Sequence, residues 1–333
     1  MAEERSCASC GGSLRRKFPF VRDAQADDTY AVLVCADCGL GHTDPIPEDI
    51  PAAYGGVYYS EQRHGITGRI RAWLRARWVE RHAGENAGQN ARSIVDAGCG
   101  TGEFLREMEG RGWTVGGTEL EHRARQLLGT TLDVRADLEH FAERAPIGVV
   151  SMWHSLEHTT DPKAQVEAAF RLLRPGGRLV VAVPNHGGWE VKLFGRHAFQ
   201  LDVPRHLYHF DLGSLERLLS DAGFTLEVVG HQELEYDVMC WLQSALNASV
   251  SPPNALFNWI IGRPLHGTRG QLAASLVLGG VLLLPALVAA LVSVLVHRGS
   301  VLKVVARKSA AVREAASGAS TGGGPSPRAP GPS

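Results

Sequence analysis

The segment that most constrains the fold is the run from Val95 to Gly102, which reads Val-Asp-Ala-Gly-Cys-Gly-Thr-Gly. Glycine lacks a Cβ, so its backbone can take positive φ and approach a ligand closely. The next residues, Glu103 to Arg111, have the composition of a helix. A strand, a glycine turn and a helix predict a doubly wound α/β fold with a ligand at the turn, although a glycine triplet alone also fits a tight turn without a ligand.

Acidic residues after the next strands indicate an adenosine-containing cofactor. We expect a second strand at Thr114 to Thr118, which ends at Glu119, and a third at Thr131 to Val134, followed by Asp137. A carboxylate at the end of the second strand can accept hydrogen bonds from both ribose hydroxyls. A dinucleotide site would carry this signal as well.

Several motifs in order make residues 91–232 resemble the class I S-adenosylmethionine-dependent methyltransferases. The motifs are Asp96 with the glycine turn, Glu119, Asp137-Leu138, Leu156-Glu157-His158 after a fourth strand at Gly148 to Met152, and the run from Leu172 to Pro184. The resemblance implies a seven-stranded, Rossmann-like sheet whose last strand is antiparallel. It also explains Asp96, because a sulfonium and an ammonium group attract a carboxylate that would repel a pyrophosphate.

The resemblance assigns roles to individual residues. Gly98, Gly100 and Gly102 would line the methionine part of the cofactor, and Asp96 would lie near its amino group. Glu119 would bind the ribose. Asp137 would accept a hydrogen bond from the adenine amino group, and the backbone N–H of Leu138 would donate to the ring.

Two Cys-x-x-Cys-Gly sequences predict a metal site near the N-terminus. Cys7 and Cys10 belong to the first, and Cys35 and Cys38 to the second. Four thiolates form the closed tetrahedral site that structural Zn²⁺ prefers. Two disulfides are the alternative, but they are rare in cytosolic proteins. A strand at Tyr30 to Val34 should lead into the second pair, whereas Cys99 and Cys240 are expected to be buried residues.

Charge and the N-terminal residues bear on location and partners. The 34 basic and 35 acidic residues nearly cancel, so we expect no nucleic-acid partner. The start, Met-Ala-Glu-Glu-Arg-Ser, is charged, and no apolar signal-peptide segment follows it. The catalytic part is therefore expected in the cytosol, with a homodimer as one possible assembly.

A helix is predicted before the glycine turn. Apolar residues recur at helical spacing at Ile66, Ile70, Trp73, Leu74 and Trp78, and arginines occupy the other faces. This composition suits a membrane surface. It also suits a lid helix that packs on the catalytic domain with a solvated basic side.

Histidines provide the candidate catalytic bases. His154 and His158 follow the fourth strand, and His206 lies in the segment Pro204 to Phe210, ahead of a helix at Leu212 to Ala222. Histidine can remove a proton from a methyl acceptor near neutral pH. Similar quinone O-methyltransferases carry a metal-binding carboxylate at the position of His154. That departure puts a catalytic magnesium in doubt, and no second metal is predicted.

Residues 272–296 contain no charge and are long enough to cross a bilayer. Yet residues 300–308 read as the last strand, which should pair with the strand at Thr225 to Val229, so both must lie on one side of a membrane. A helical hairpin broken at Gly279-Gly280 or Pro285 would keep both strands on one side, because each arm is too short to span the membrane and the segment would be monotopic. A second pass through Val238 to Gly262 is an alternative, and burial inside the protein or a dimer is another.

The sequence therefore predicts six regions: a zinc ribbon (1–45), a linker and helical cap (46–90), a cofactor-binding core (91–232), a hydrophobic membrane-associating insert (233–299), the last strand (300–309) and a disordered tail (310–333). The predicted activity is methyl transfer from S-adenosylmethionine to a small-molecule or lipid-linked acceptor at the cytoplasmic side of a membrane, by O- or C-methylation. Deoxysugar C-methyltransferases are similar in domain order. The alternative is a non-catalytic membrane scaffold with a vestigial cofactor site.

Overall fold

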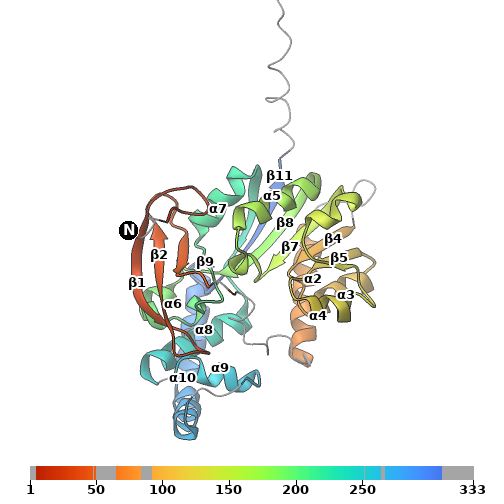
Figure 1. The fold of residues 1–333 in the computed structure, drawn as a ribbon. Helices are drawn as coiled ribbons and strands as arrows, with labels where there is room; N and C mark the ends of the chain where they lie inside the picture. Colours follow the sequence, from red (N-terminus) through yellow and green to blue (C-terminus); the bar gives the residue numbers. More distant parts are fainter. Residues whose placement is uncertain are drawn as a thin grey trace, which may run out of the picture.

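The computed structural model describes residues 5–47, 49, 65–83, 92–250, 252–263 and 267–309. The tyrosine-rich stretch 54–59 and the predicted disordered tail lie outside these residues. Figure 1 shows two sheets, a large one crossed by helices and a smaller one beside it.

The larger sheet has seven strands, the number that the resemblance predicted, in the order β10-β11-β8-β7-β4-β5-β6. The strands are β4 (Ser93–Ala97), β5 (Thr114–Thr118), β6 (Val134–Arg135), β7 (Ile147–Trp153), β8 (Leu173–Pro184), β10 (Phe224–Gly230) and β11 (Val301–Lys308). The first four are parallel, and β7 also pairs in parallel with β8. The last strand, β11, runs antiparallel between β8 and β10.

Helices cover both faces of this sheet, so its central strands are buried on both sides. One core joins the sheet to α5 (Pro162–Leu172) and α7 (Leu212–Asp221), through residues such as Val150, Val181 and Leu215. The other core joins it to α2 (Ile66–His82) and α3 (Glu103–Gly110), through residues such as Ile94, Val149 and Leu105. A further helix, α4 (His122–Leu128), follows β5.

The smaller sheet combines the N-terminal module with a segment of the core. Its order is β1 (Leu14–Arg22), β2 (Thr29–Cys35), β3 (Gly41–Asp44) and β9 (Tyr208–His209). The strand β9 comes from the histidine-rich segment and pairs with Gly41 and His42. The N-terminal module is thus hydrogen-bonded to a segment that the sequence places in the methyltransferase core.

The helix α2 forms as predicted, but it packs through a different face. Its buried residues are Gly68, Ala72, Ala76 and Val79, of which Ala76 and Val79 belong to the core on the α3 side of the sheet. Four of the predicted apolar residues are exposed, Ile66, Ile70, Trp73 and Leu74, whereas Trp78 is partly buried against the same core. Small residues allow close helix packing, so the bulky side chains point outward.

The insert is a helical hairpin between β10 and β11. It consists of α8 (Leu234–Ser249), α9 (Ala255–Ile260) and α10 (Arg269–Leu295). Two glycines allow close contacts in the insert. A Cβ at Gly267, between α9 and α10, would lie 2.7 Å from Pro252, and one at Gly299, before β11, would overlap the carbonyl of His231. In Figure 1, α10 lies at the lower end of the molecule.

The predicted break inside the apolar run is wrong. The helix α10 is continuous through Gly279-Gly280 and Pro285. Its small buried residues pack toward the insert core, and a Cβ at Gly279 would lie 3.3 Å from Leu256, so this glycine serves close packing. The predicted second pass is also wrong, because 238–262 divides into α8 and the short α9.

Candidate functional site

The glycine turn follows β4 and is stabilised by the neighbouring strand. Gly98, Gly100 and Gly102 all have positive φ, at 78°, 54° and 73°. The N–H of Gly98 donates to the carbonyl of Thr118 over 3.0 Å. A Cβ added at Gly98 would lie 2.6 Å from Cβ of Ser155, whereas one at Gly100 would meet nothing within 4 Å. The turn is therefore packed on one side and open at Gly100, where a ligand can approach the backbone.

Glu119 lies beside this turn, as predicted. Its side chain belongs to a residue only 5 % exposed, and Oε2 accepts a hydrogen bond of 3.1 Å from the N–H of Gly100. Its Oε1 accepts from the N–H of Glu121. These bonds fix a carboxylate at the carboxyl ends of β4 and β5, where ligands bind in open α/β sheets.

Asp96 is buried within β4. The hydroxyl of Ser151 donates to its Oδ1 over 2.7 Å. Burial raises the pKa of the Asp96 carboxyl to about 7, and the hydrogen bond from Ser151 and the charge of Arg75 only partly oppose this. A positively charged ligand group nearby would favour the carboxylate, so Asp96 fits the predicted role next to a cofactor amino group.

Asp137 and Leu138 lie farther along the same edge. Asp137 is half-buried and accepts hydrogen bonds from the backbone and ring of His140, with a ring distance of 2.6 Å. Leu138 is buried and precedes the 3-10 helix η1 (Glu139–Arg144). Their predicted contacts with adenine remain predictions.

His154 is held in an ion-pair network. Its Nε2 lies 2.6 Å from Oε2 of Glu233, and its Nδ1 lies 3.5 Å from Oε1 of Glu157. Burial would lower the pKa of His154, but the charge of Glu233 and the hydrogen bonds to both carboxylates raise it to about 10. His154 is thus an imidazolium at neutral pH, which argues against it as the base.

Two residues of this network, Arg75 and Glu233, escaped the sequence analysis. Arg75 of α2 bonds Glu233 over 3.2 Å and lies over the ring of Trp153 at 4.9 Å. Burial opposes ionisation of Glu233, but Arg75 and His154 hold its pKa well below the usual range. No sequence pattern marks Arg75 in α2 and Glu233 before α8 as partners, because their contact depends on tertiary packing.

The other two predicted histidines lie together. His158 belongs to the 3-10 turn η2 (Leu156–His158), and its ring centroid is 4.8 Å from that of His206 in an edge-to-face arrangement. Glu157, which is 1 % exposed, is next to them. Ligand atoms of Glu157, His158 and His206 lie within 4.8 Å of one another. The structure therefore groups His158 with His206, and Glu157 belongs both to this group and to the ion-pair network of His154.

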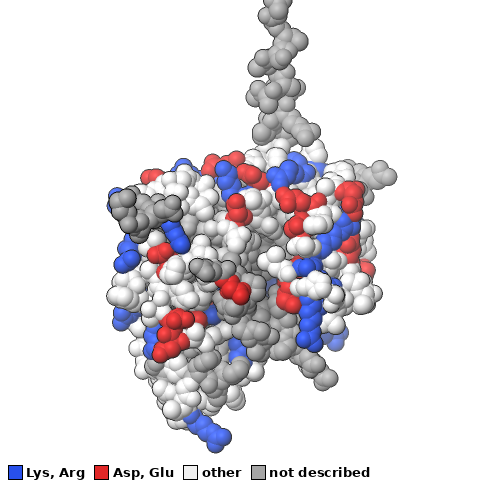
Figure 2. Space-filling model, viewed as in Figure 1, with Lys and Arg blue, Asp and Glu red and all other residues white. Residues whose placement is uncertain are grey.

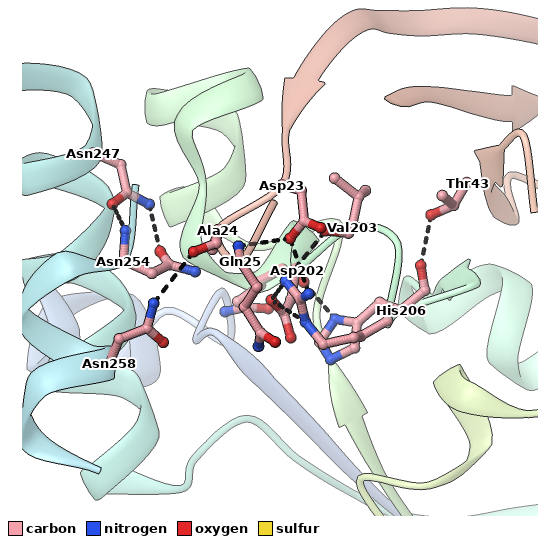
Figure 3. A network of polar contacts seen from close by, with 12 residues as sticks. Asp23, Ala24, Gln25, Thr43, Asp202, Val203, His206, Asn247, Asn254 and Asn258 are labelled. Carbon is pink, nitrogen blue, oxygen red and sulfur yellow. Dashed lines mark hydrogen bonds and ion pairs between the residues drawn. The ribbon is translucent and has the colours of Figure 1, made fainter. Parts of the chain in front are cut away.

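A polar network holds the segment that carries His206 (Figure 3). Arg205 is buried and donates to Asp23 over 2.9 Å and to Asp202 over 2.6 Å. The hydroxyl of Thr43 donates to the carbonyl of His206 over 2.5 Å. The N-terminal module therefore positions the histidine. Arg205 was missed as well, although a long cation three residues after Asp202 in an apolar segment was a possible signal.

The four predicted cysteines form one cluster. Sγ of Cys7 is 3.5 Å from that of Cys38, and Cys10 and Cys35 are equally far apart. A disulfide bond would measure about 2.05 Å, and all four thiols are free. The separations approach the value of about 3.8 Å expected for thiolates around one Zn²⁺ with bonds near 2.3 Å. Burial raises the pKa of Cys35, but the backbone N–H groups of Cys38 and Asp37 bring it to about 7.

Sequence comparison identifies a protein family and several relatives that this chain resembles. A family model described as a methyltransferase domain matches residues 64–229. The ubiquinone biosynthesis O-methyltransferase of Pseudomonas paraeruginosa (strain PA7) is 33% identical over 177 residues, which cover 47% of this chain and 73% of that protein. The protein of the same name from Thiobacillus denitrificans is 35% identical over 170 residues, or 46% of this chain and 72% of the relative.

Coverage is lower for other relatives, and structural similarity is weak. The match to the Pseudomonas aeruginosa LESB58 enzyme of that name covers 51% of its length. A putative sarcosine dimethylglycine methyltransferase from Galdieria sulphuraria aligns with a TM-score of 0.46 and 12% identity over 78% of this chain and 96% of that one. The fold is therefore defined by the sheet order and strand directions described above.

Proposed function

Because the chain belongs to the class I S-adenosylmethionine-dependent methyltransferases, we propose that it O-methylates a small acceptor that is linked to a lipid. Its relatives named as O-methyltransferases of ubiquinone biosynthesis favour oxygen over carbon as the methylated atom. The single observation that carries the lipid part is the exposed apolar surface of α10 beside the catalytic domain.

S-adenosylmethionine supplies a methyl group on a positively charged sulfur, so the protein has to bind it and orient the acceptor. The open side of Gly100 leaves room for the cofactor, Asp96 matches its amino group and Glu119 matches its ribose. Retention of all these groups makes a vestigial cofactor site, and hence the scaffold alternative, unfavourable.

Deprotonation of the acceptor is assigned to the group of Glu157, His158 and His206. These residues follow β7 and precede β9, and Ser155 in the same stretch packs against Gly98 of the cofactor turn. Burial and the neighbouring His158 lower the pKa of His206, so its ring is neutral at physiological pH. A neutral imidazole can accept a proton, whereas His154 cannot.

The membrane proposal rests on α10. Among the described residues, one helix, Arg269–Leu295, is long and apolar enough to cross a membrane, and 22% of its most apolar window is buried. Its exposed bulky residues include Val277, Val281, Leu284 and Val288. Figure 2 shows white atoms, which are neither acidic nor basic, over much of the lower end of the molecule, with basic side chains at its tip.

Topology favours attachment from one side. Strands β10 and β11 are neighbours in one sheet, so the chain leaves and re-enters the domain at the same edge. We therefore propose that α10 lies against or within one leaflet of the membrane, with the catalytic domain on the cytoplasmic side. A lipid-linked acceptor would then reach the site from the surface that α10 contacts.

The cysteine cluster is proposed to hold a structural Zn²⁺. Four thiolates would fill its coordination sphere and leave no open position for chemistry. The ion would stabilise the turns that carry β2 and β3, and β3 bonds the segment of His206 through β9.

The proposed acceptor class can be tested with matched phenolic substrates that have or lack a prenyl tail. In the presence of liposomes, we expect at least tenfold higher kcat/KM for the tailed compound. Replacing Val281, Leu284 and Val288 with lysine should remove this preference and liposome binding, while turnover of the tailless compound is retained. Equal kcat/KM for both compounds would contradict the lipid-linked acceptor.

A further inference from the structure

Three buried side chains near the carboxyl edge of the large sheet carry polar atoms without a protein partner. They are Glu190 of α6 (Trp189–Phe194), Gln200 of the 3-10 turn η4 (Phe199–Leu201) and Ser300, which precedes β11. Within the described part of the chain, Oε2 of Glu190, both amide atoms of Gln200 and Oγ of Ser300 form no hydrogen bond. A buried polar atom without a partner is costly, so such atoms indicate a bound water or ligand.

These side chains gather around one point. The buried thiol of Cys240 in α8 faces the side chains of Gln200 and Ser300. Burial raises the pKa of this thiol, and the nearby Glu190 and Asp237 raise it further. A thiol is a weak hydrogen-bonding group, so it satisfies an amide or a hydroxyl poorly. We propose that Glu190, Gln200 and Ser300 form a subsite for an uncharged hydroxyl or carbonyl group of the methyl acceptor, distinct from the oxygen that is methylated. This assignment rests on the proposed function.

The subsite adjoins the candidate base and the end of β8. The carbonyl of Gln200 accepts a hydrogen bond of 2.7 Å from Nδ1 of His206. The carbonyl of Ser300 accepts one of 2.8 Å from the N–H of Asn185, the residue that follows β8. Ligands of open α/β sheets bind beyond the carboxyl ends of the strands. An acceptor whose hydroxyl faces His206 can therefore extend a second polar group toward Gln200 and Ser300.

The charges around the subsite select an uncharged group. Oε1 of Glu190 accepts hydrogen bonds from the hydroxyl of Ser244 and from the N–H of Phe199, the latter over 3.1 Å. Burial raises the pKa of Glu190 to about 8, so this side chain is mostly a neutral acid at pH 7. Because Oε1 accepts both hydrogen bonds, the proton belongs on Oε2, where it is available to a ligand. Asp237, whose charge also raises that pKa, disfavours an anionic group such as a carboxylate or a phosphate.

The helix α8 covers the subsite with a polar face. Oδ1 of Asp237 accepts a hydrogen bond of 2.7 Å from the N–H of Ser300, and the hydroxyl of Ser244 donates to α6. Trp241 and Leu242 instead belong to the apolar core that α8 shares with α10. Because polar interfaces between segments separate more readily than apolar ones, a shift of α8 can admit the acceptor. Its polar group would then lie under α8, and its lipid tail on the α10 side of the insert.

Binding of matched phenols tests the subsite without turnover. The full-length protein is saturated with S-adenosylhomocysteine, and calorimetry measures the affinity of two prenyl-tailed compounds, one with a single ring hydroxyl and one with two adjacent hydroxyls. We expect wild type to bind the dihydroxy compound about fivefold more tightly, as one additional hydrogen bond allows. Gln200→Leu, which removes both amide atoms, and Ser300→Ala should reduce this ratio toward one. Gln232→Leu is the matched control, because Gln232 is exposed between β10 and α8, and it should keep the ratio.

Calorimetry with S-adenosylmethionine shows whether each variant is folded, because none of these residues belongs to the predicted cofactor set. Equal binding of the two phenols by wild type, or no binding of either, would overturn the subsite. A ratio that stays at the wild-type value in both variants would overturn it too, because the unpartnered atoms would then hold only water. Discrimination between the two phenols without methyl transfer to either would instead reject the proposed function.

Discussion

Nε2 of His154 lies 2.6 Å from Oε2 of Glu233, so the end of the central strand β7 is ion-paired to the residue that begins the insert. Arg75 of α2 bonds the same carboxylate. The insert, α2 and the catalytic edge thus share one buried ion-pair network. A shift of the insert at a membrane would act directly on the residues that flank the cofactor turn.

Replacing Glu233 with glutamine should destabilise the protein by about 3 kcal/mol, because it leaves two buried cations without their shared anion. The raised pKa of His154 means that its contribution is complete below about pH 6.5 and is lost as pH rises through about 10. The depressed pKa of Glu233 makes its contribution fade at acid pH.

Urea unfolding at several pH values measures the free energy of unfolding of wild type and of Glu233→Gln. The difference between wild type and variant should be largest near pH 6 and shrink toward pH 10. Glu227→Gln is the control, because Glu227 pairs with Arg178 and Arg307 in a more exposed position and should cost less than about 1 kcal/mol. A difference that grows with pH would contradict the assignment of charges.

Much of the fold was predictable from local patterns. The strand at Thr114 to Thr118 was correctly predicted from its place after the glycine turn and helix. The antiparallel direction of the last strand was correctly predicted from the family resemblance. The pairing of β3 with β9 was not, since two residues of strand carry no recognisable pattern and the partner is over 160 residues away. Long-range contacts also account for the missed Arg75, Arg205 and Glu233.

The insert shows why hydropathy alone was insufficient. Gly279 and Pro285 were read as breaks, but glycine at a helix contact allows close packing, and the proline ring is on the exposed side of α10. The same small residues that weaken a helix locally permit its packing against α8. The membrane association that hydropathy suggests remains a prediction.

Gly98 and Gly100 should respond differently to alanine. Both have positive φ, which costs about 1 kcal/mol for alanine, but at Gly98 the new Cβ also overlaps Ser155. We expect Gly98→Ala to lower stability by more than 2 kcal/mol, and Gly100→Ala to fold well while losing cofactor affinity. Thermal melts and calorimetry separate the effects; normal cofactor affinity in Gly100→Ala would argue against a ligand at this turn.

Glu119→Ala should weaken binding of S-adenosylmethionine by roughly 1.5–3 kcal/mol, because it removes a charge-assisted hydrogen bond to the ribose. Isothermal titration calorimetry provides the dissociation constants. Glu109→Ala, on the exposed side of α3, should leave them unchanged. Equal affinities for wild type and Glu119→Ala would remove Glu119 from the cofactor site.

Loss of the proposed structural Zn²⁺ should affect residues far from the cysteines. Cys38→Ser is expected to release the ion and to destabilise β2, β3 and the paired β9. Hydrogen exchange should then increase at Gly41 and Tyr208, with little change in β4 and β5. Unaltered exchange at Tyr208 in the metal-free variant would show that the N-terminal module does not support the histidine segment.

Transfer of label from deuterium-methylated S-adenosylmethionine shows whether the methyl acceptor is linked to a lipid. Purified protein is incubated with the labelled cofactor and a membrane lipid extract, and products are identified by mass spectrometry. We expect an added CD₃ group on the oxygen of a lipid-tailed compound, formed by wild type and strongly reduced in Glu119→Ala. Label found only in water-soluble or protein products would contradict it.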